Sequence, residues 1–139
     1  MGMVYADIEL INGQDVLDAK RYIIGEDEIR HMPVRMLVDS GSFMMAINED
    51  IQACMGFPVV EERRPIELAN GKVVRLDVVG HIKVRFANRM AICSAFLLPG
   101  DSEPLLGAIP MEEMDVLIHP KRLELVVNPM HPDAATLRL

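Results

Sequence analysis

One carboxylate stands out among the residues that could do chemistry, because it lies between two apolar segments. Asp39 follows the apolar residues 36–38 (Met-Leu-Val), and after Ser40 and Gly41 a second apolar segment begins at 43–45 (Phe-Met-Met). Asp, Ser and Gly are all turn formers, so a solvated surface turn is one interpretation. A solvated turn does not require apolar residues on both sides, however. A carboxylate between two apolar strands is expected to be partly buried, and such carboxylates are usually paired or functional, which makes Asp39 a candidate general acid or base.

Alternative chemistries have weaker support in the sequence. A serine nucleophile would require a glycine on each side of the serine, and Ser42 lacks the second one. The histidines lack the i, i+4 spacing of a zinc-binding helix and have no cysteine pair nearby; they are His31, His81, His119 and His131. The glycines form no phosphate-binding loop. We therefore expect a site without a metal ion and without an organic cofactor.

Length and charge limit the class of protein. The 139 residues predict a single domain spanning 1–139, with a core from about 4 to 127 and a loosely held C-terminal tail at 128–139. The formal net charge of −7 argues against a nucleic-acid partner, because phosphate binding requires a basic surface. The N-terminus lacks the pattern of a signal peptide, and no apolar stretch approaches the roughly 20 residues of a membrane-spanning helix. We expect a cytoplasmic protein without a membrane partner.

The two cysteines fit the same compartment. Cys54 and Cys93 both lie in apolar surroundings of the sequence and have no CxxC partner. In a reducing cytoplasm the favoured interpretation is two buried free thiols, with a single disulfide between them as the open alternative.

The elements that must position Asp39 are mostly strands, because the dominant period of the sequence is two. Strands are expected over residues 4–11, 33–39, 43–47, 66–76 (as a hairpin), 81–86, 90–98, 116–118 and 123–127. One weak internal repeat is present: a buried strand, a turn, an apolar pair with Gly and a short helix occur at 38–55 and again at 96–114. The sequence therefore predicts a mostly β fold with one or two short helices in a closed or nearly closed sheet.

Turn and helix signals separate these strands. Asn48 can cap a short helix that Gly56 closes, and Pro110 suits the first turn of a second helix. The pair at 70–71, Asn-Gly, predicts a hairpin with a type I′ turn, because this turn requires two positive φ angles. A second Asn-Gly pair at 12–13 is expected to form a turn after the first strand.

In this order the elements resemble the retropepsin-like aspartic proteases, in particular single-domain bacterial members related to the retroviral enzymes. The resemblance runs from about Pro33 to Val127. It includes the segment 37–42 (Leu-Val-Asp-Ser-Gly-Ser), the helix after it, the hairpin at 66–76 where the family carries its flap, and the segment 105–107 (Leu-Leu-Gly) before the last helix. The resemblance implies a retropepsin-like closed β-barrel with a flap hairpin, assembled as a symmetric homodimer that hydrolyses peptide or protein substrates.

The resemblance also implies roles for individual residues. Asp39 would be the catalytic acid, Ser40 would supply the hydroxyl that hydrogen-bonds across the paired active-site loops, and Gly41 would let the loop approach the substrate. Further residues of the catalytic loop, the flap and the second-half segment would bind substrate: Ser42, Leu68, Ala69, Asn70, Gly71, Leu106 and Gly107.

Several positions depart from the family pattern. Ser42 stands where retroviral enzymes usually carry Ala, and Ala108 stands where they carry an Arg that supports the catalytic loop. The hairpin has one glycine, Gly71, in place of a glycine-rich flap, and the stretch before Pro33 is longer than a retroviral N-terminus. The single-glycine flap and Ala108 favour the alternative function, a non-catalytic dimerisation or peptide-binding module with the same fold.

The proposed chemistry itself predicts a dimer. One carboxylate must act as general base on a water molecule while a second, protonated carboxyl polarises the scissile carbonyl. Two carboxyl groups about 3 Å apart cannot both be charged, so they share a proton and titrate as a unit. The chain has a single Asp-Ser/Thr-Gly segment. A two-fold axis would supply the second carboxylate from another copy.

Overall fold

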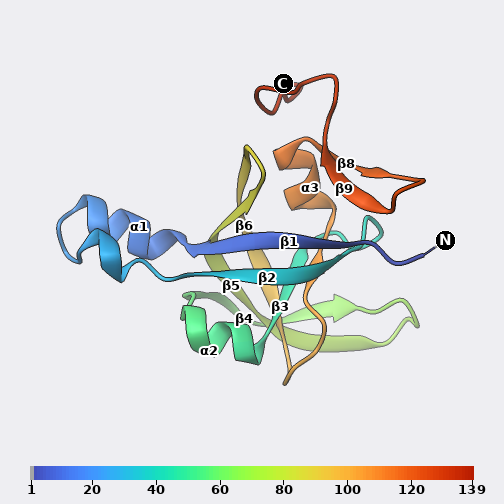
Figure 1. Ribbon diagram of the computed structural model, residues 1–139. Coiled ribbons are helices and arrows are strands. Elements are labelled where there is room, and N and C mark those ends of the chain that lie inside the picture. Colours follow the sequence, from blue (N-terminus) through green and yellow to red (C-terminus); the bar gives the residue numbers. More distant parts are fainter. Residues whose placement is uncertain (1) are drawn as a thin grey trace.

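The computed structural model describes residues 2–139 and is mostly β (Figure 1). Its strands are β1 (Tyr5–Asn12), β2 (His31–Val38), β3 (Met45–Asn48), β4 (Val59–Glu67), β5 (Val73–Phe86), β6 (Arg89–Leu98), β7 (Leu105–Leu106), β8 (Val116–His119) and β9 (Glu124–Val127). Its helices are α1 (Gly13–Lys20), the 3₁₀ turn η1 (Glu26–Glu28), α2 (Glu49–Met55) and α3 (Ala108–Met114). The described chain thus has three short α-helices, whereas the sequence predicted one or two.

Six of the strands form a ring. The main sheet has the order β1-β2-β7-β3-β6-β5-β4, and β1 also pairs with β5, so the hydrogen-bonded neighbours return to the first strand. The hairpin of β4 and β5 extends beyond this ring, and α1 projects at the opposite end (Figure 1). The mostly β prediction is confirmed, and the strands close on themselves as a ring.

The weak internal repeat of the sequence corresponds to an approximate two-fold arrangement of strands. β3 lies parallel to β6, and β7 lies parallel to β2. β3 and β7 meet each other in antiparallel orientation at Ala46 and Leu105, and each is followed directly by a short helix. β2 and β7 come from the two halves of the repeat. Their pairing places Leu106 beside Val38 at the end of β2, although the two residues are more than sixty positions apart in the sequence.

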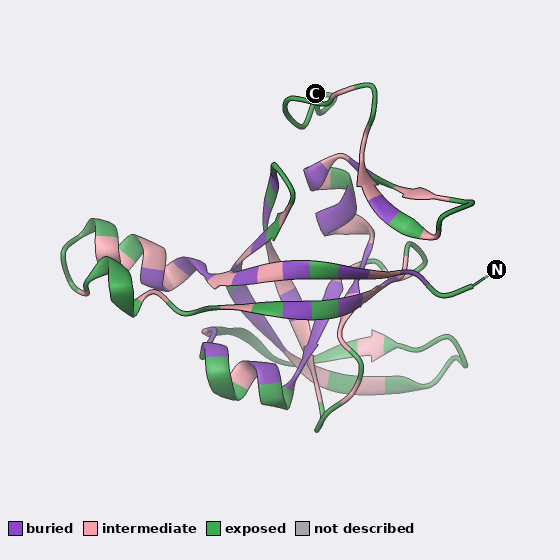
Figure 2. Ribbon diagram, viewed as in Figure 1, coloured by how far each residue is buried: buried purple, intermediate pink, exposed green. Residues whose placement is uncertain are grey.

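The core is built from aliphatic residues and methionines, as the scarcity of aromatics predicted. Side chains alternate between buried and exposed along β1 and β2, which is the pattern of strands with one face in the core. Methionines fill much of the interior, with Met36, Met45, Met55 and Met114 almost completely buried. The outer strand β4 is exposed along almost its whole length (Figure 2). The hairpin of β4 and β5 is therefore attached to the core mainly through β5.

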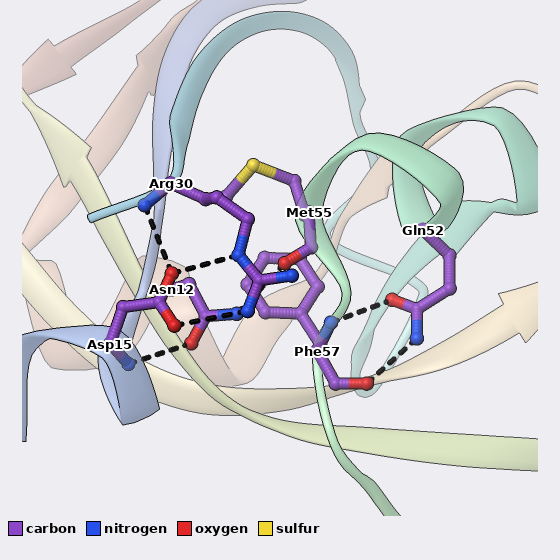
Figure 3. A network of polar contacts seen from close by, with 6 residues as sticks. All are labelled: Asn12, Asp15, Arg30, Gln52, Met55 and Phe57. Atoms are coloured by element: carbon purple, nitrogen blue, oxygen red, sulfur yellow. Dashed lines mark hydrogen bonds and ion pairs between the residues drawn. The ribbon is translucent and has the colours of Figure 1, made fainter. Parts of the chain in front are cut away.

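The segment 12–13 does not form the expected turn. Asn12 caps α1 instead: its Oδ1 accepts the N–H of Asp15 at 3.0 Å, and its Nδ2 donates to the Met55 carbonyl at 2.8 Å. Asp15 in turn accepts three hydrogen bonds from Arg30, two from the guanidinium and one from the backbone N–H, at 2.8–3.0 Å (Figure 3). This network, in which Asn12 and Asp15 are buried, joins α1, the residue before β2 and the end of α2. The turn prediction was wrong because an Asn before Gly can serve equally as an N-cap.

Replacement of Asp15 by alanine is expected to lower the free energy of unfolding by about 1–3 kcal/mol, because three hydrogen bonds from Arg30 to the buried Asp15 carboxylate are lost. The hydrogen bond from the Arg30 side chain is the main cause that lowers the pKa of the Asp15 carboxyl. Its stabilising effect is therefore present above the pKa of an unfolded aspartate and is lost as pH falls through the lower folded pKa.

Urea unfolding of the wild type and of Asp15→Ala at pH 7 and pH 3 would measure this effect. The difference between the two proteins should shrink at the lower pH. Asp18→Ala, on the same helix, is the control and should change stability by no more than about 0.5 kcal/mol. Equal losses from both substitutions would contradict the assigned role of Asp15.

Neither cysteine is paired in the described chain. Cys54 is exposed on α2 and Cys93 is half-buried on β6. Burial raises the pKa of the Cys93 thiol to about 12, and the Glu113 carboxylate acts in the same direction. Two free thiols agree with the favoured interpretation, but the expectation that both are buried was wrong for Cys54. Residues 2–139 contain no helix with the length and apolarity required to cross a membrane.

Candidate active site

Asp39 occupies the first position after β2, where three backbone hydrogen bonds fix the chain. Leu37 N–H donates to Pro104 O at 3.0 Å, and Val38 N–H donates to Val4 O at 2.7 Å. The N–H of Asp39 itself donates to Leu106 O at 2.9 Å. The strand end is thus held from both sides, by the segment before β1 and by β7. The position of Asp39 is determined by backbone pairing and does not depend on its side chain.

The Asp39 side chain stabilises the loop that follows it. Its Oδ1 accepts the backbone N–H of Gly41 at 3.0 Å, and the N–H of Ser42 donates to the Asp39 carbonyl at 3.1 Å. Among the described residues, the Asp39 carboxylate has no other hydrogen-bond partner, and it is half-buried. Its second oxygen, Oδ2, is therefore free to interact with a water molecule, a substrate or another carboxyl group.

The first turn of α3 holds the far end of the same loop. The N–H groups of Ala108 and Ile109 donate to the carbonyls of Ser42 and Phe43 at 2.8 and 3.0 Å. These are the free N–H groups of a helix N-terminus, which require acceptors from outside the helix. Gly107 permits the approach, because a Cβ at this position would collide with the carbonyl oxygens of Met44 and Ser42. Gly107 thus makes a close backbone contact that positions the loop, and its expected role in substrate binding stays a prediction.

The hairpin expected at 66–76 is present, formed by β4 and β5. At its tip Gly71 N–H donates to Leu68 O at 2.9 Å, and Leu68 N–H donates to Lys72 O at 2.8 Å. Gly71 has a φ of +81°, whereas Asn70 is not among the described residues with positive φ. The predicted type I′ turn, which needs two positive φ angles, was therefore wrong. The pattern is that of a three-residue loop in which a glycine in the left-handed region follows a type I turn.

A cavity of about 420 Å³ lies between the Asp39 loop and this hairpin. Five of the residues expected from the sequence line it, namely Asp39, Gly41, Ser42, Leu68 and Ala69. The remaining expected residues do not: Ser40 is exposed at the turn, Asn70 and Gly71 lie at the exposed hairpin tip, and Leu106 and Gly107 are buried. The structure thus brings together two segments that are almost thirty residues apart in the sequence.

Most of the apolar lining of the cavity was missed by the sequence-based prediction. These residues come from the loop after Asp39 and from strands β3 to β7: Phe43, Met44, Ala46, Ile66, Leu76, Phe96, Leu98 and Leu105. Leu105 faces the cavity and Leu106 faces the core, the reverse of what was expected for Leu106. The orientation of the two leucines follows from the period of two within strands. Leu106 is in register with buried Val38 and therefore points to the core, and Leu105 points to the opposite face. Only the register identifies which of two adjacent leucines faces the site.

The ionisable side chains around the cavity are few. Asp39 and Glu67 are the two acidic residues among its lining residues, and no lysine or arginine of the described residues lines it. On β4 the half-buried Ile66 faces the cavity, so strand alternation turns the neighbouring Glu67 side chain outward and leaves its backbone at the rim. Within residues 2–139 no group of three or more His, Cys, Asp or Glu side chains is arranged to hold a metal ion. Asp39 is thus the acidic residue whose side chain faces this cavity among the described residues.

Residues 24–109 match a protein family described as aspartyl protease. No curated protein matches the chain. The matched segment contains the Asp39 loop, both strands of the β4–β5 hairpin, β6 and β7. It therefore includes every residue that lines the cavity around Asp39.

Proposed function

This chain belongs to the aspartyl protease family, within the retropepsin-like clan, and from this premise we propose that it is an endopeptidase whose catalytic centre consists of Asp39 from each of two copies. The observation that carries the proposal is the position of Asp39. A carboxylate held by backbone hydrogen bonds, with one oxygen free, lies at the floor of an apolar cavity under a hairpin. Cleavage of an extended peptide by this chemistry requires a carboxylate with a free oxygen beside the cavity in which the peptide lies.

In the proposed mechanism the two Asp39 carboxyl groups share one proton. The charged one removes a proton from a water molecule as its oxygen attacks the scissile carbonyl carbon, while the protonated one donates a hydrogen bond, then its proton, to the carbonyl oxygen. In the second step the tetrahedral carbon re-forms its carbonyl by returning that proton, and the amide nitrogen leaves as an amine after receiving the proton taken from water. The hydrogen bond from Gly41 N–H to Oδ1 would keep the carboxylate plane fixed during both steps.

Two exposed residues of the catalytic loop support a shared centre. Ser40 is exposed, and among the described residues its hydroxyl has no hydrogen-bond partner. Phe43 is 73% exposed although it borders the cavity. A large apolar side chain in solvent beside a half-formed site is expected to be covered by a second copy or by the substrate. We propose that Ser40 bonds across the two-fold axis and that Phe43 is covered when the site is complete.

The hairpin of β4 and β5 is proposed to act as the flap. Leu68 and Ala69 lie on the side of its turn that lines the cavity, and the tip residues are exposed. The outer strand β4 has few buried contacts, which is typical of segments that open at low cost in free energy. An extended peptide would lie between this hairpin and Asp39, with its side chains against the apolar lining.

Specific proteolytic activity is expected to fall on dilution, because each chain carries half of the catalytic centre. When most of the protein is monomeric, activity per chain should decrease in proportion to concentration, since the dimer fraction depends on its square. The measurement is the cleavage rate of an unfolded protein substrate over a concentration series that brackets the dimer dissociation constant from analytical ultracentrifugation. Constant specific activity well below that constant would contradict the shared centre.

The alternative, a non-catalytic peptide-binding module, gives a different result in the same assay. Ala108 lacks the side chain that supports the loop in retroviral enzymes, although its backbone N–H holds the Ser42 carbonyl here. A peptide mimic with a statine group would bind to this chain whether the chain is a protease or a non-catalytic binding module. Only the protease would cleave the unfolded substrate and be inhibited by that mimic.

A further inference from the structure

A second cavity, of about 570 Å³, lies along α3 and the start of β8. Its apolar surface comes from Ile109, Met111, Val116 and Leu117, and Glu112 and Glu113 stand on its rim. The remaining side is formed by residues 136–138 near the C-terminus. We call this cavity the α3 groove, and residues 128–139 the C-terminal arm. Figure 1 shows the arm above α3 and the β8–β9 hairpin.

The C-terminal arm, expected to be loosely held, makes several hydrogen bonds at Asp115, which follows α3. Asn128 Nδ2 lies 2.9 Å from Asp115 Oδ1, while His131 Nδ1 and the backbone N–H of Thr136 lie 2.6 and 3.1 Å from Oδ2. The hydrogen bond from Asn128 is the largest cause that lowers the pKa of Asp115, to about 2, followed by that from Thr136. Asp115 at the end of the groove therefore already binds a backbone N–H of the C-terminal arm.

A second set of contacts anchors the middle of the arm. Asn88, in the turn between β5 and β6, donates from Nδ2 to the carbonyls of Pro132 and Asp133 at 2.9 and 3.2 Å. The guanidinium of buried Arg89 donates to the His131 carbonyl. Residues 128–136 are thus fixed by polar contacts at both Asp115 and the β5–β6 turn. Residues 137–139 have no such contact in the described structure.

The end of the arm fits the groove incompletely. Leu137 and Arg138 line it, yet Leu137 remains 60% exposed and Arg138 forms no ion pair with the described residues. The cavity of about 570 Å³ persists beside them. A leucine followed by an arginine therefore lies at the edge of an apolar groove with an acidic rim without being buried there.

The charges of the groove are complementary to a basic segment. Among residues 2–139, its lining contains three carboxylates, Glu112, Glu113 and Asp115, and one cation, Arg138 of the arm. Glu113 Oε2 accepts the N–H of Ile92 at 3.2 Å, while Glu112 is exposed and is in no ion pair of the described chain. An apolar residue would cover the apolar surface between α3 and β8, and a neighbouring Lys or Arg would meet Glu112.

The groove is connected directly to the proposed catalytic loop. Ile109 lines the groove with its side chain, and its backbone N–H donates to the Phe43 carbonyl. A segment bound along α3 would therefore lie on the same helix whose first turn fixes the loop after Asp39.

We propose that the α3 groove is a docking site for an extended segment of the protein substrate in which an apolar residue precedes a basic one, and that the C-terminal arm competes with this segment for the groove. This inference rests on the proposed protease function. It adds a recognition site that is separate from the cavity at Asp39, and it assigns to Leu137 and Arg138 the role of a weak internal competitor.

The test uses a fluorescently labelled peptide with the sequence of residues 134–139 (Ala-Ala-Thr-Leu-Arg-Leu) and the full-length protein. The double variant Leu137→Ser/Arg138→Ala, called the weakened-arm variant, removes the side chains by which the C-terminal arm competes for the α3 groove. It should bind the peptide about threefold to tenfold more tightly than the wild type, because occupation of the groove by the arm reduces the apparent affinity for the peptide. Adding Glu112→Lys to that variant should weaken binding by about tenfold, since it places a like charge beside the peptide arginine. The charge-matched control is Glu26→Lys, on η1 at the α1 end of the molecule, which should leave binding unchanged.

Specificity is measured with a second peptide in which Ser replaces Leu and Glu replaces Arg, and this peptide should not compete. Equal binding of both peptides, or no difference between the wild type and the weakened-arm variant, would overturn the proposal. A change from dimer to monomer in sedimentation of the weakened-arm variant would also overturn it, because the arm would then be an element exchanged between copies.

The failure of this proposal can be distinguished from the failure of the protease function. A short peptide substrate that fills only the Asp39 cavity should be cleaved equally by the wild type, the weakened-arm variant and Glu112→Lys. A protein substrate with an apolar-basic segment away from the cleaved bond should be cleaved more slowly by Glu112→Lys. Absence of cleavage of both substrates by all proteins would count against the proposed function and leave the peptide-binding result unaffected.

Discussion

Asp39→Asn is expected to lower the rate of peptide hydrolysis by about 10³-fold or more, because an amide cannot accept the proton of the attacking water. The fold should be preserved. Backbone hydrogen bonds to Leu106 and Val4 position the end of β2, and an asparagine Oδ1 can still accept the Gly41 N–H. The measurement is the cleavage rate of an unfolded protein, together with the melting temperature and the sedimentation coefficient of the variant.

The matched control for this substitution is Asp101→Asn, in the exposed loop before β7. Asp101 does not line the cavity around Asp39, so its loss should leave the rate unchanged. Cleavage by Asp39→Asn at a rate near that of the wild type would identify Asp39 as an ordinary turn residue. Cleavage lost together with the fold would instead indicate that the carboxylate is needed for the loop structure.

Gly107→Ala is expected to have the second-largest effect, on both stability and activity. The new Cβ would meet the carbonyl oxygens of Met44 and Ser42, which are backbone atoms that cannot rotate away. Overpacking of this kind typically costs about 1–3 kcal/mol of stability. Relief of the clash would move α3 away from the Asp39 loop and lengthen the hydrogen bond from Ala108 N–H to Ser42 O. We therefore expect a lower melting temperature and at least about tenfold slower cleavage, since small misplacements of catalytic groups reduce the rate strongly.

Gly80→Ala provides the comparison. A Cβ at Gly80 would contact the side chain of Val60, which is about half exposed and can adjust its rotamer. This substitution should therefore cost much less stability than Gly107→Ala and leave the cleavage rate within about twofold of the wild type. Similar effects of the two substitutions would show that the contact between Gly107 and the loop carbonyls does not position Asp39.

Local chemistry was sufficient to predict many elements from the sequence. Asn48 caps α2 by accepting the Ile51 N–H at 2.9 Å, and Gly56 ends this helix with a φ of +57°. Both features depend only on residues within one or two turns of each other. The same holds for the alternating strands and for the loop after Asp39, where an aspartate, a serine and a glycine follow an apolar strand. The family, its candidate acid and the mostly β fold were therefore accessible without the structure.

Local chemistry was ambiguous where one signal has two outcomes. The Asn-Gly pair at 12–13 begins a helix, because the Asn12 side chain also finds the Met55 carbonyl, forty-three residues away. The pair at 70–71 forms a different turn from the predicted one, with a single positive φ angle at Gly71. In both places the neighbours that select the outcome come from tertiary contacts or from the strands on either side.

The sequence by itself determined the candidate acid and the strand that it follows. Only the tertiary structure decided what surrounds that acid. The pairing of β2 with β7 brings the Leu106 carbonyl to the Asp39 N–H, faces Leu105 to the cavity and buries Leu106. The pairing of β4 with β5 brings Leu68 and Ala69 to the same cavity. The physical reason is that a strand presents alternate residues to opposite faces, so a shift of one residue between strands distant in sequence would exchange every residue of the site for one of the core.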